Sequence, residues 1–212
     1  MDTIKKIENE LMGKSIELSS LDKDKTVLIV VDMVNGFVYS GPLSSDRVAS
    51  VAANISALNE KTSGCRKVFF LDSHEEGAKE FGSFPVHCLK GSEEARLIPE
   101  LDTDYSRGPG IVHIEKNSTN GFNTEEFRKW LDENLDKTDN YIVTGCVTDI
   151  CVLQFALSLK AYFNQVNKNK RIVVPSNCVE TYDGGSHDGY LMNLFALYNM
   201  HTSGIEIVDK IN

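Results

Sequence analysis

The sequence has no long hydrophobic run and no surplus of basic residues. Its longest aliphatic stretch covers residues 27–31, whereas a membrane-spanning helix needs about 20 apolar residues. Lys and Arg total 22 against 31 Asp and Glu, which gives a formal net charge of −9. Because phosphate-rich partners are bound by surplus positive charge, the composition argues against nucleic acid or a membrane as the main partner.

The sequence also shows no signature of a signal peptide or of a disulfide framework. Residues 1–19 alternate charged and apolar side chains, with neither a continuous hydrophobic core nor a small-residue cleavage site. We therefore predict a cytosolic (cytoplasmic) protein. The five cysteines are odd in number, scattered, and never spaced as CxxC. This arrangement favours reduced thiols over a disulfide scaffold or a zinc knuckle.

Short apolar runs alternate with longer segments of helical period along the chain. The runs are nearly continuous in Val, Ile, Phe and Tyr, which is typical of strands covered on both faces. The predicted strands are 26–31, 67–71, 110–114, 140–144, 171–174 and 205–208. The predicted helices are 4–12, 46–63, 124–136, 150–166 and 187–201.

This alternation predicts an α/β fold with right-handed crossovers. We expect a doubly wound sheet of about six mostly parallel strands, with helices on both faces. The length of 212 residues is compatible with one domain. The sequence therefore predicts a single domain over residues 1–212, in which residues 1–24 are an N-terminal extension.

Charged and reactive side chains follow four of the predicted strands. Asp32 follows the first strand, Asp72 the second, Lys116 the third and residues 145–151 the fourth. In open α/β sheets, ligands bind beyond the carboxyl ends of the strands, so these residues are predicted to share one site. The competing interpretation is that charged side chains end strands only to reach water.

The segment TGCVTDICV leads from the fourth strand into a helix and carries a candidate nucleophile, Cys151. A cysteine in the first turn of a helix lies near unpaired backbone N–H groups, which favour thiolate over thiol and can stabilise an oxyanion. Asp32 is a candidate base for the thiol proton, and Lys116 is a candidate cation beside both groups. The alternative for Cys151 is a small buried hydrophobic residue.

Asp72, His74 and His87 form a candidate metal site. Asp72 and His74 stand two residues apart, so in an extended segment their side chains point to the same side. Two imidazoles and a carboxylate suit Zn, Fe(II) or Mn, with open positions for water or a ligand. The alternative is a surface loop that contains two histidines. We interpret the remaining histidines as structural, with His187 beginning the last helix and His201 ending it.

Together these motifs resemble the isochorismatase-like cysteine hydrolase superfamily, and within it the nicotinamidases (pyrazinamidases). The resemblance covers roughly residues 25–208, and it rests on VDMVNGF, DSH, FPVHC, Lys116 and GCVTDICV. It implies an isochorismatase-like fold with a six-stranded parallel sheet. It also implies that Cys151 is the nucleophile, Asp32 the general acid/base and Lys116 the orienting cation.

The resemblance further implies an oxyanion hole and an activity. Family members have a cis peptide bond before the position of Thr148, and the N–H groups of Thr148 and Cys151 would form the oxyanion hole. True isochorismatases lack the cysteine, so Cys151 favours amide hydrolysis. The implied reaction converts nicotinamide to nicotinate and ammonia through a thioester. Two alternatives stay open: an amidase for a ureido acid or N-carbamoyl compound, and a non-catalytic small-molecule-binding protein.

The resemblance implies a divalent metal ion, with Zn first and Fe or Mn next, that binds the pyridine nitrogen of the substrate. The implied ligands are Asp72, His74 and His87. Some members place a further ligand, directly or through water, at the position of Glu80. The small-molecule amide is the one expected partner, and the oligomeric state stays open, a homo-oligomer included.

Departures from the family pattern concern the substrate pocket. Ser73 stands where many members carry Trp, Phe84 replaces another frequent Trp, and Asn35 occupies a position often held by Gln. Phe37, Phe84 and Val147 are our candidates for pocket walls. The alternative for the two phenylalanines is ordinary core packing.

Overall fold

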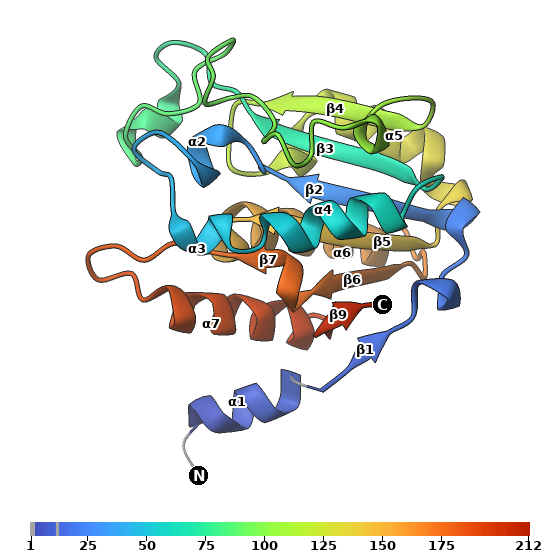
Figure 1. Cartoon of the computed structure of the whole chain (residues 1–212). Coiled ribbons are helices and arrows are strands. Elements are labelled where there is room, and N and C mark those ends of the chain that lie inside the picture. Colours follow the sequence, from blue (N-terminus) through green and yellow to red (C-terminus); the bar gives the residue numbers. More distant parts are fainter. Residues whose placement is uncertain (1–2, 12) are drawn as a thin grey trace.

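The computed structural model describes residues 3–11 and 13–212, and its centre is a parallel sheet (Figure 1). The strand order is β4-β3-β2-β5-β6-β8, and every neighbouring pair is parallel. The strands are β2 (Thr26–Val31), β3 (Arg66–Asp72), β4 (Ile111–Lys116), β5 (Asn140–Cys146), β6 (Arg171–Pro175) and β8 (Glu206–Val208). These strands confirm the predicted α/β sheet.

The strand order reverses between β2 and β5, which lie side by side at the centre of the sheet. Their ladder ends with Val31 opposite Gly145. Gly145 has φ 114°, and a Cβ atom there would lie 2.0 Å from the Val31 carbonyl oxygen, so this close approach requires glycine. Ligands of open α/β sheets bind at the carboxyl ends of the strands where the order reverses. The topology therefore places a binding crevice beyond β2 and β5.

Helices cover both faces of the sheet. Within β2, Val27, Ile29 and Val31 face one hydrophobic layer, whereas Leu28 and Val30 face the other. The first layer contains α1 (Thr3–Leu11), α5 (Glu125–Asn134), α6 (Leu153–Gln165) and α7 (Gly189–Thr202); the second contains α3 (Asp46–Ala49) and α4 (Ala52–Lys61). In Figure 1, α4 lies in front of the sheet and α6 behind it.

Several predicted helix boundaries differ from the observed ones. The predicted helix 46–63 is divided into α3 and α4. The predicted helix 187–201 begins later, at Gly189, because the Asp188 side chain accepts a hydrogen bond from the Leu191 N–H and caps α7. The predicted helix 4–12 is observed as α1, and its predicted last residue, Met12, lies outside the described residues.

Three strands of two residues each were missed by sequence reasoning. β7 (Val179–Glu180) pairs with the end of β5, and β1 (Ser15–Ile16) pairs with β9 (Lys210–Ile211) near the C-terminus. Two residues are too few to show the alternation of apolar and polar side chains that marks a strand. The position of such a strand depends instead on a partner distant in sequence. The β1–β9 pairing and the buried Ile7 and Leu11 of α1 attach the N-terminal extension to the rest of the fold.

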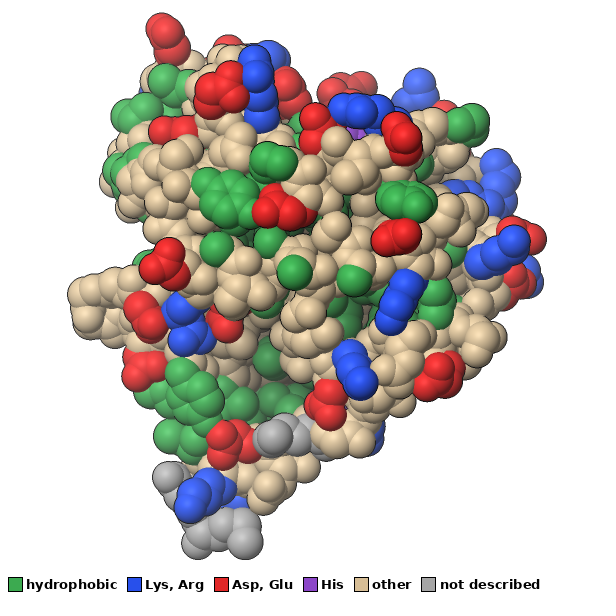
Figure 2. Space-filling view, viewed as in Figure 1, with side chains coloured by type: hydrophobic (Ala, Val, Ile, Leu, Met, Phe, Trp, Pro, Cys, Tyr) green, Lys and Arg blue, Asp and Glu red, His purple; other side chains and the backbone are tan. Residues whose placement is uncertain are grey.

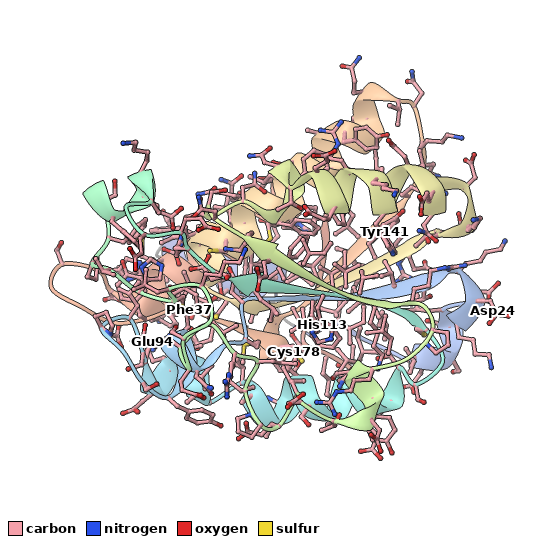
Figure 3. All side chains as sticks on the ribbon, turned by 90° about the horizontal axis from the view of Figure 1, so that it is seen from above. Asp24, Phe37, Glu94, His113, Tyr141 and Cys178 are labelled. Carbon is pink, nitrogen blue, oxygen red and sulfur yellow. The ribbon has the colours of Figure 1, made fainter. Side chains whose placement is uncertain are left out.

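The surface shown in Figure 2 mixes acidic and basic side chains, and hydrophobic side chains gather where α1 approaches α7. Within residues 3–11 and 13–212, no helix has the length and apolar character that crossing a bilayer requires. Figure 3 views the sheet from above and shows Phe37 and Glu94 at one end, opposite Asp24. Phe37 belongs to α2 (Asn35–Val38), which follows β2, so that end holds the carboxyl ends of the strands.

Candidate active site

Asp32, Asp72 and Lys116 meet at the carboxyl ends of β2, β3 and β4. The β3–β4 register places Asp72 directly opposite Lys116, so their side chains are neighbours. Lys116 Nζ lies 2.7 Å from Asp32 Oδ2 and 2.6 Å from Asp72 Oδ1, and none of the three side chains is more than 2% exposed. The interpretation that these charges end strands to reach water is therefore wrong. Two buried carboxylates share one ammonium group.

Asp32 has the properties of a proton acceptor. Its backbone φ is 53°, a conformation that is uncommon outside glycine and that clusters at functional sites. Neither carboxylate oxygen has a well-aligned hydrogen bond within the described chain, although Oδ2 contacts Lys116. Burial raises the pKa of Asp32 to about 7, against the opposing attraction of Lys116. Asp32 can therefore take up and release a proton near neutral pH.

Lys116 and Asp72 instead carry fixed charges. Burial alone would lower the pKa of Lys116, but Asp32 and Asp72 hold it well above its usual range. Burial alone would raise the pKa of Asp72, but the neighbouring Lys116 ammonium holds it well below its usual range. Asp32 is thus the group of this cluster that titrates near neutral pH.

Cys151 lies in a π-helical turn, Thr148–Val152, that joins β5 to α6. Its Sγ is 4.0 Å from Lys116 Nζ, so the structure brings the three predicted catalytic residues together. Burial raises the pKa of the Cys151 thiol, and Lys116 only partly opposes this. This burial opposes the thiolate expected at a helix start, because the sulfur is enclosed beside two carboxylates. The thiol needs a proton acceptor, and Asp32 is the nearby candidate.

The cis peptide bond lies between Cys146 and Val147, so its expected position before Thr148 is wrong by one residue. Pairing with β7 holds the chain extended through Cys146, and the cis bond is the first one beyond that pairing. Sequence alone contains no signal for its exact place, because neither residue is proline. Thr148 is fully buried. The oxyanion-hole role of the Thr148 and Cys151 N–H groups stays a prediction.

Asp72, His74 and His87 converge on one point and form a group that we call the metal-ligand group. Asp72 Oδ2 lies 2.8 Å from His74 Nε2 and 3.0 Å from His87 Nε2, and the two nitrogens are 3.2 Å apart. All three residues are buried. The His74 N–H donates to the Cys88 carbonyl oxygen at 2.8 Å, which aligns the segment after β3 with the segment that carries His87.

The other ring nitrogens show what this group is suited to hold. His87 Nδ1 donates to the Pro85 carbonyl oxygen at 2.8 Å, and His74 Nδ1 donates to Asn117 Oδ1 at 3.2 Å. Asn117 Oδ1 also accepts the Glu75 N–H, which identifies it as the oxygen. With hydrogen on Nδ1, each neutral ring presents an Nε2 lone pair. The two Nε2 lone pairs and the Asp72 carboxylate repel one another unless a positive charge lies among them. Two imidazole nitrogens and a carboxylate oxygen fit a divalent transition metal.

Glu80 lies at the edge of the metal-ligand group. Its Oε1 is 3.8 Å from His74 Nε2, farther than the members of the group are from one another. Its Oε2 accepts a hydrogen bond from the Thr119 N–H at 2.9 Å. This position agrees with a ligand that acts through water or after a small shift.

A cavity of about 440 Å³ opens beside Cys151 and the metal-ligand group. The three predicted wall residues, Phe37, Phe84 and Val147, all line it. The rings of Phe37 and Phe84 lie 5.6 and 6.3 Å from the ring of His87. The cavity is lined by Phe37, Pro42, Leu43, Ser44, Asp72, Glu80, Ser83, Phe84, Pro85, His87, Thr119, Val147, Ile150, Cys151, Tyr182, Asp183 and Gly184.

Sequence reasoning missed two parts of this lining. Residues 42–44 follow α2, and residues 182–184 follow β7. The Gly184-Gly185 pair indicates a turn, but nothing in the sequence places that turn at the site. Its location depends on the pairing of β7 with the end of β5, which brings it beside the π-helical turn that carries Cys151.

Comparison with known proteins agrees with this geometry. Residues 26–206 match the isochorismatase domain model. The chain is 29% identical over 224 residues to Nicotinamidase 1 of Arabidopsis thaliana, covering 91% of this chain and 89% of that protein. It is similar to the crystal structure of N-carbamoylsarcosine amidase from Thermoplasma acidophilum, with a TM-score of 0.68 and 25% identity over 87% of this chain and 95% of that one.

A further solved structure with the same fold is the pyrazinamidase of Pyrococcus horikoshii in complex with zinc. Its TM-score is 0.69 at 22% identity, over 87% of this chain and 98% of that one. The family match includes β2 to β6, the three predicted catalytic residues and the metal-ligand group. The chain therefore belongs to the isochorismatase-like hydrolase family and is nicotinamidase-like within it.

Proposed function

We propose that this protein is a metal-assisted cysteine amidohydrolase that converts nicotinamide to nicotinate and ammonia. One observation carries the proposal: Cys151 and the ligand side chains of Asp72 and His87 line the same cavity. A nucleophile and a metal site on one cavity suit a substrate that carries both an amide and a metal-binding atom. Nicotinamide has both, and the similarity to Nicotinamidase 1 supports this choice.

The charge of the cavity favours an uncharged aromatic amide. Among the described residues that line it, none is Lys or Arg, whereas Asp72, Glu80 and Asp183 are acidic. A ureido acid carries a carboxylate that would be unpaired against these groups, which is costly in a partly buried site. Phe37 and Phe84 offer ring faces to an aromatic substrate. The likeness to N-carbamoylsarcosine amidase makes a ureido acid the second candidate.

In the proposed reaction, Asp32 accepts the thiol proton of Cys151, and the thiolate attacks the carbonyl carbon of the amide. Lys116 stays charged beside both groups and compensates the negative charge that moves between them. Asp32 then returns the proton to the amide nitrogen, so ammonia leaves and a thioester to Cys151 is formed. A water molecule gives a proton to Asp32 while its oxygen attacks the thioester carbon. The carbon–sulfur bond then breaks, Asp32 returns the proton to the Cys151 sulfur, and the released acid loses its proton to water as nicotinate.

Asp72, His74 and His87 would hold the metal ion, with Glu80 beside them. Zinc is the first choice for two imidazoles and a carboxylate, and Fe or Mn is the alternative. When bound, a divalent ion supplies an electrophilic site for the pyridine nitrogen and so orients the carboxamide. Asn117 and the Pro85 carbonyl keep the two imidazoles in the ligating tautomer.

The test is ammonia release from nicotinamide by purified protein of known metal content. We expect release that stops on chelation and returns on addition of Zn, Fe(II) or Mn. N-Carbamoylsarcosine is assayed in parallel, and the Cys151→Ala variant serves as the blank. Release from N-carbamoylsarcosine alone would favour the second candidate, and no release from either substrate by metal-loaded protein would favour a binding protein.

A further inference from the structure

Residues 181–187 follow β7, precede the Asp188 cap of α7 and form the outer wall of the cavity; we call them the mouth loop. Tyr182, Asp183 and Gly184 of this loop line the cavity. Figure 1 shows the loop projecting from the sheet at the far left, beyond the carboxyl ends of the strands. Two backbone hydrogen bonds between Gly184 and His187 close its tip.

One carboxylate, that of Asp149 in the π-helical turn that carries Cys151, contacts both ends of the mouth loop. At the start of the loop, Thr181 Oγ1 donates to Asp149 Oδ1 at 2.6 Å. At its end, His187 Nε2 lies 2.8 Å from Asp149 Oδ2. Asp149 precedes Cys151 by two residues in the same π-helical turn. The outer wall of the cavity is therefore attached directly to the turn that carries the nucleophile.

Both ring nitrogens of His187 make polar contacts, and one face of its ring stacks on another ring. Its Nδ1 donates to the Tyr182 carbonyl oxygen at 2.9 Å, while Nε2 faces Asp149. Its ring stacks on the Tyr182 ring, with centroids 3.9 Å apart and an angle of 7° between the planes. The side chains of His187 and Asp149 are only 18% and 14% exposed. This arrangement determines where the Tyr182 ring lies.

The other attachments of the mouth loop hold atoms outside the Tyr182 ring. Arg47 of α3 donates from Nε to the Thr181 carbonyl oxygen at 3.2 Å and pairs with Glu180 at 2.9 Å. The Asp183 side chain accepts the Gly189 N–H at 2.7 Å. These contacts hold the backbone, whereas His187 is the residue that stacks on Tyr182.

We propose that His187 is a positioning residue that holds the Tyr182 ring as the outer wall of the substrate cavity, through its bridge from Asp149. The identity of the substrate that this wall contacts rests on the proposed amidase function. The bridge does not touch Asp32, Lys116 or the metal-ligand group. Loss of His187 therefore weakens substrate binding and leaves the chemical steps unchanged.

The first test is steady-state hydrolysis of nicotinamide by metal-loaded variants. We expect His187→Ala to raise KM about tenfold, as the loss of a stacked aromatic wall would, with kcat within about twofold of the wild type. Tyr182→Leu gives the same rise, and the double variant gives no further rise, because both remove one wall. His201→Gln, at the other end of α7, is the matched control. An unchanged KM, a loss confined to kcat, or additive effects in the double variant overturn the proposal.

The second test does not depend on the substrate. Cys151 is alkylated with iodoacetamide and with the bulkier N-ethylmaleimide, and Cys151→Ala corrects for the other cysteines. We expect the alkylation rate with N-ethylmaleimide, divided by the rate with iodoacetamide, to rise in His187→Ala, because a displaced wall admits the bulkier reagent. The ratio should also rise in His187→Gln, which loses the stacked ring but keeps a donor for Asp149. An unchanged ratio, or an equal rise in His201→Gln, overturns the proposal. If the wild-type protein does not hydrolyse nicotinamide, the proposed function is contradicted, but the alkylation ratios still test the role of His187.

Discussion

Charged residues border the parallel sheet at both of its ends, but they are arranged differently at the two ends. At the amino ends of β5, β6 and β8, ion pairs lie near the surface. Arg171 forms two hydrogen bonds with Glu206, at 2.7 and 2.9 Å, and both side chains are 36% exposed. Lys170 pairs with Asp139 at 2.9 Å. Such pairs contribute little to stability and leave no group in need of a proton.

At the carboxyl ends, two carboxylates and one ammonium group are buried together. Asp32 and Asp72 share Lys116, so one carboxylate lacks full compensation and the pKa of Asp32 rises to about 7, mainly through burial. Position at a strand end therefore does not mark a functional residue. Burial combined with unequal charge at a cavity is the more informative signal, because it can produce a group that titrates near neutral pH.

The largest expected effect separates Cys151 from the other buried cysteines. Cys151→Ala should lower nicotinamide turnover by about 10⁴-fold or more, because it removes the nucleophile. Cys178→Ala, at another buried cysteine after β6, should leave turnover within about twofold. Ammonia release measures the activity, and circular dichroism checks the fold. Equal activity of both variants would contradict the proposed mechanism.

Lys116→Met breaks the carboxyl-end cluster itself. We expect about 3–5 kcal/mol loss in the free energy of unfolding at about pH 8, because two buried carboxylates are left without a cation. The loss should shrink at about pH 5, where uptake of protons by the unpaired carboxylates relieves their repulsion. Urea unfolding followed by Trp130 fluorescence measures both values. A loss that does not depend on pH would mean that the carboxylates do not repel each other.

The pH dependence of activity tests whether Asp32 is the titrating base. Because its pKa is raised to about 7, the carboxylate form predominates above pH 7 and accepts the thiol proton. Below pH 7, kcat/KM should fall about tenfold per pH unit as Asp32 becomes protonated. Metal content is measured at each pH, so that loss of the ion is separated from titration of the base. A profile that is flat down to about pH 5 would contradict this role.

The smallest effect is expected at the amino ends. Arg171→Met removes the cation of an exposed ion pair and should lower the free energy of unfolding by no more than about 1 kcal/mol. Turnover should stay within about twofold, because the pair lies at the opposite end of the sheet. Urea unfolding and ammonia release give the two values. A loss as large as that of Lys116→Met would remove the distinction between the two ends.

Much of the fold and of the candidate site could be predicted from the sequence, because the signals are local. Continuous apolar runs gave strands close to the observed bounds, and the residues that follow them include Asp32 and Cys151. The spacing of Asp72 and His74 placed both on one side of the chain, and the structure brings the third predicted ligand, His87, beside them. These predictions rest on backbone periodicity, which depends on neighbours along the chain.

Other features could not be predicted, because they depend on partners distant in sequence. The raised pKa of Cys151 reflects its burial beside Asp32. The cis bond lies at Val147, where the pairing with β7 ends. His187 was interpreted as the start of a helix, yet it contacts Asp149 across the mouth of the cavity.

The sequence by itself determined the parallel α/β sheet, the residue types at its strand ends and the candidate nucleophile, base and metal ligands. The tertiary structure alone decided which of those charges are buried and how the cavity is closed. The physical reason is that the periodicity of apolar side chains is local, whereas a pKa depends on every charge and solvent-excluding group around the site. The pKa of Asp32 is raised only where β2, β3 and β4 bury it together with Asp72 and Lys116.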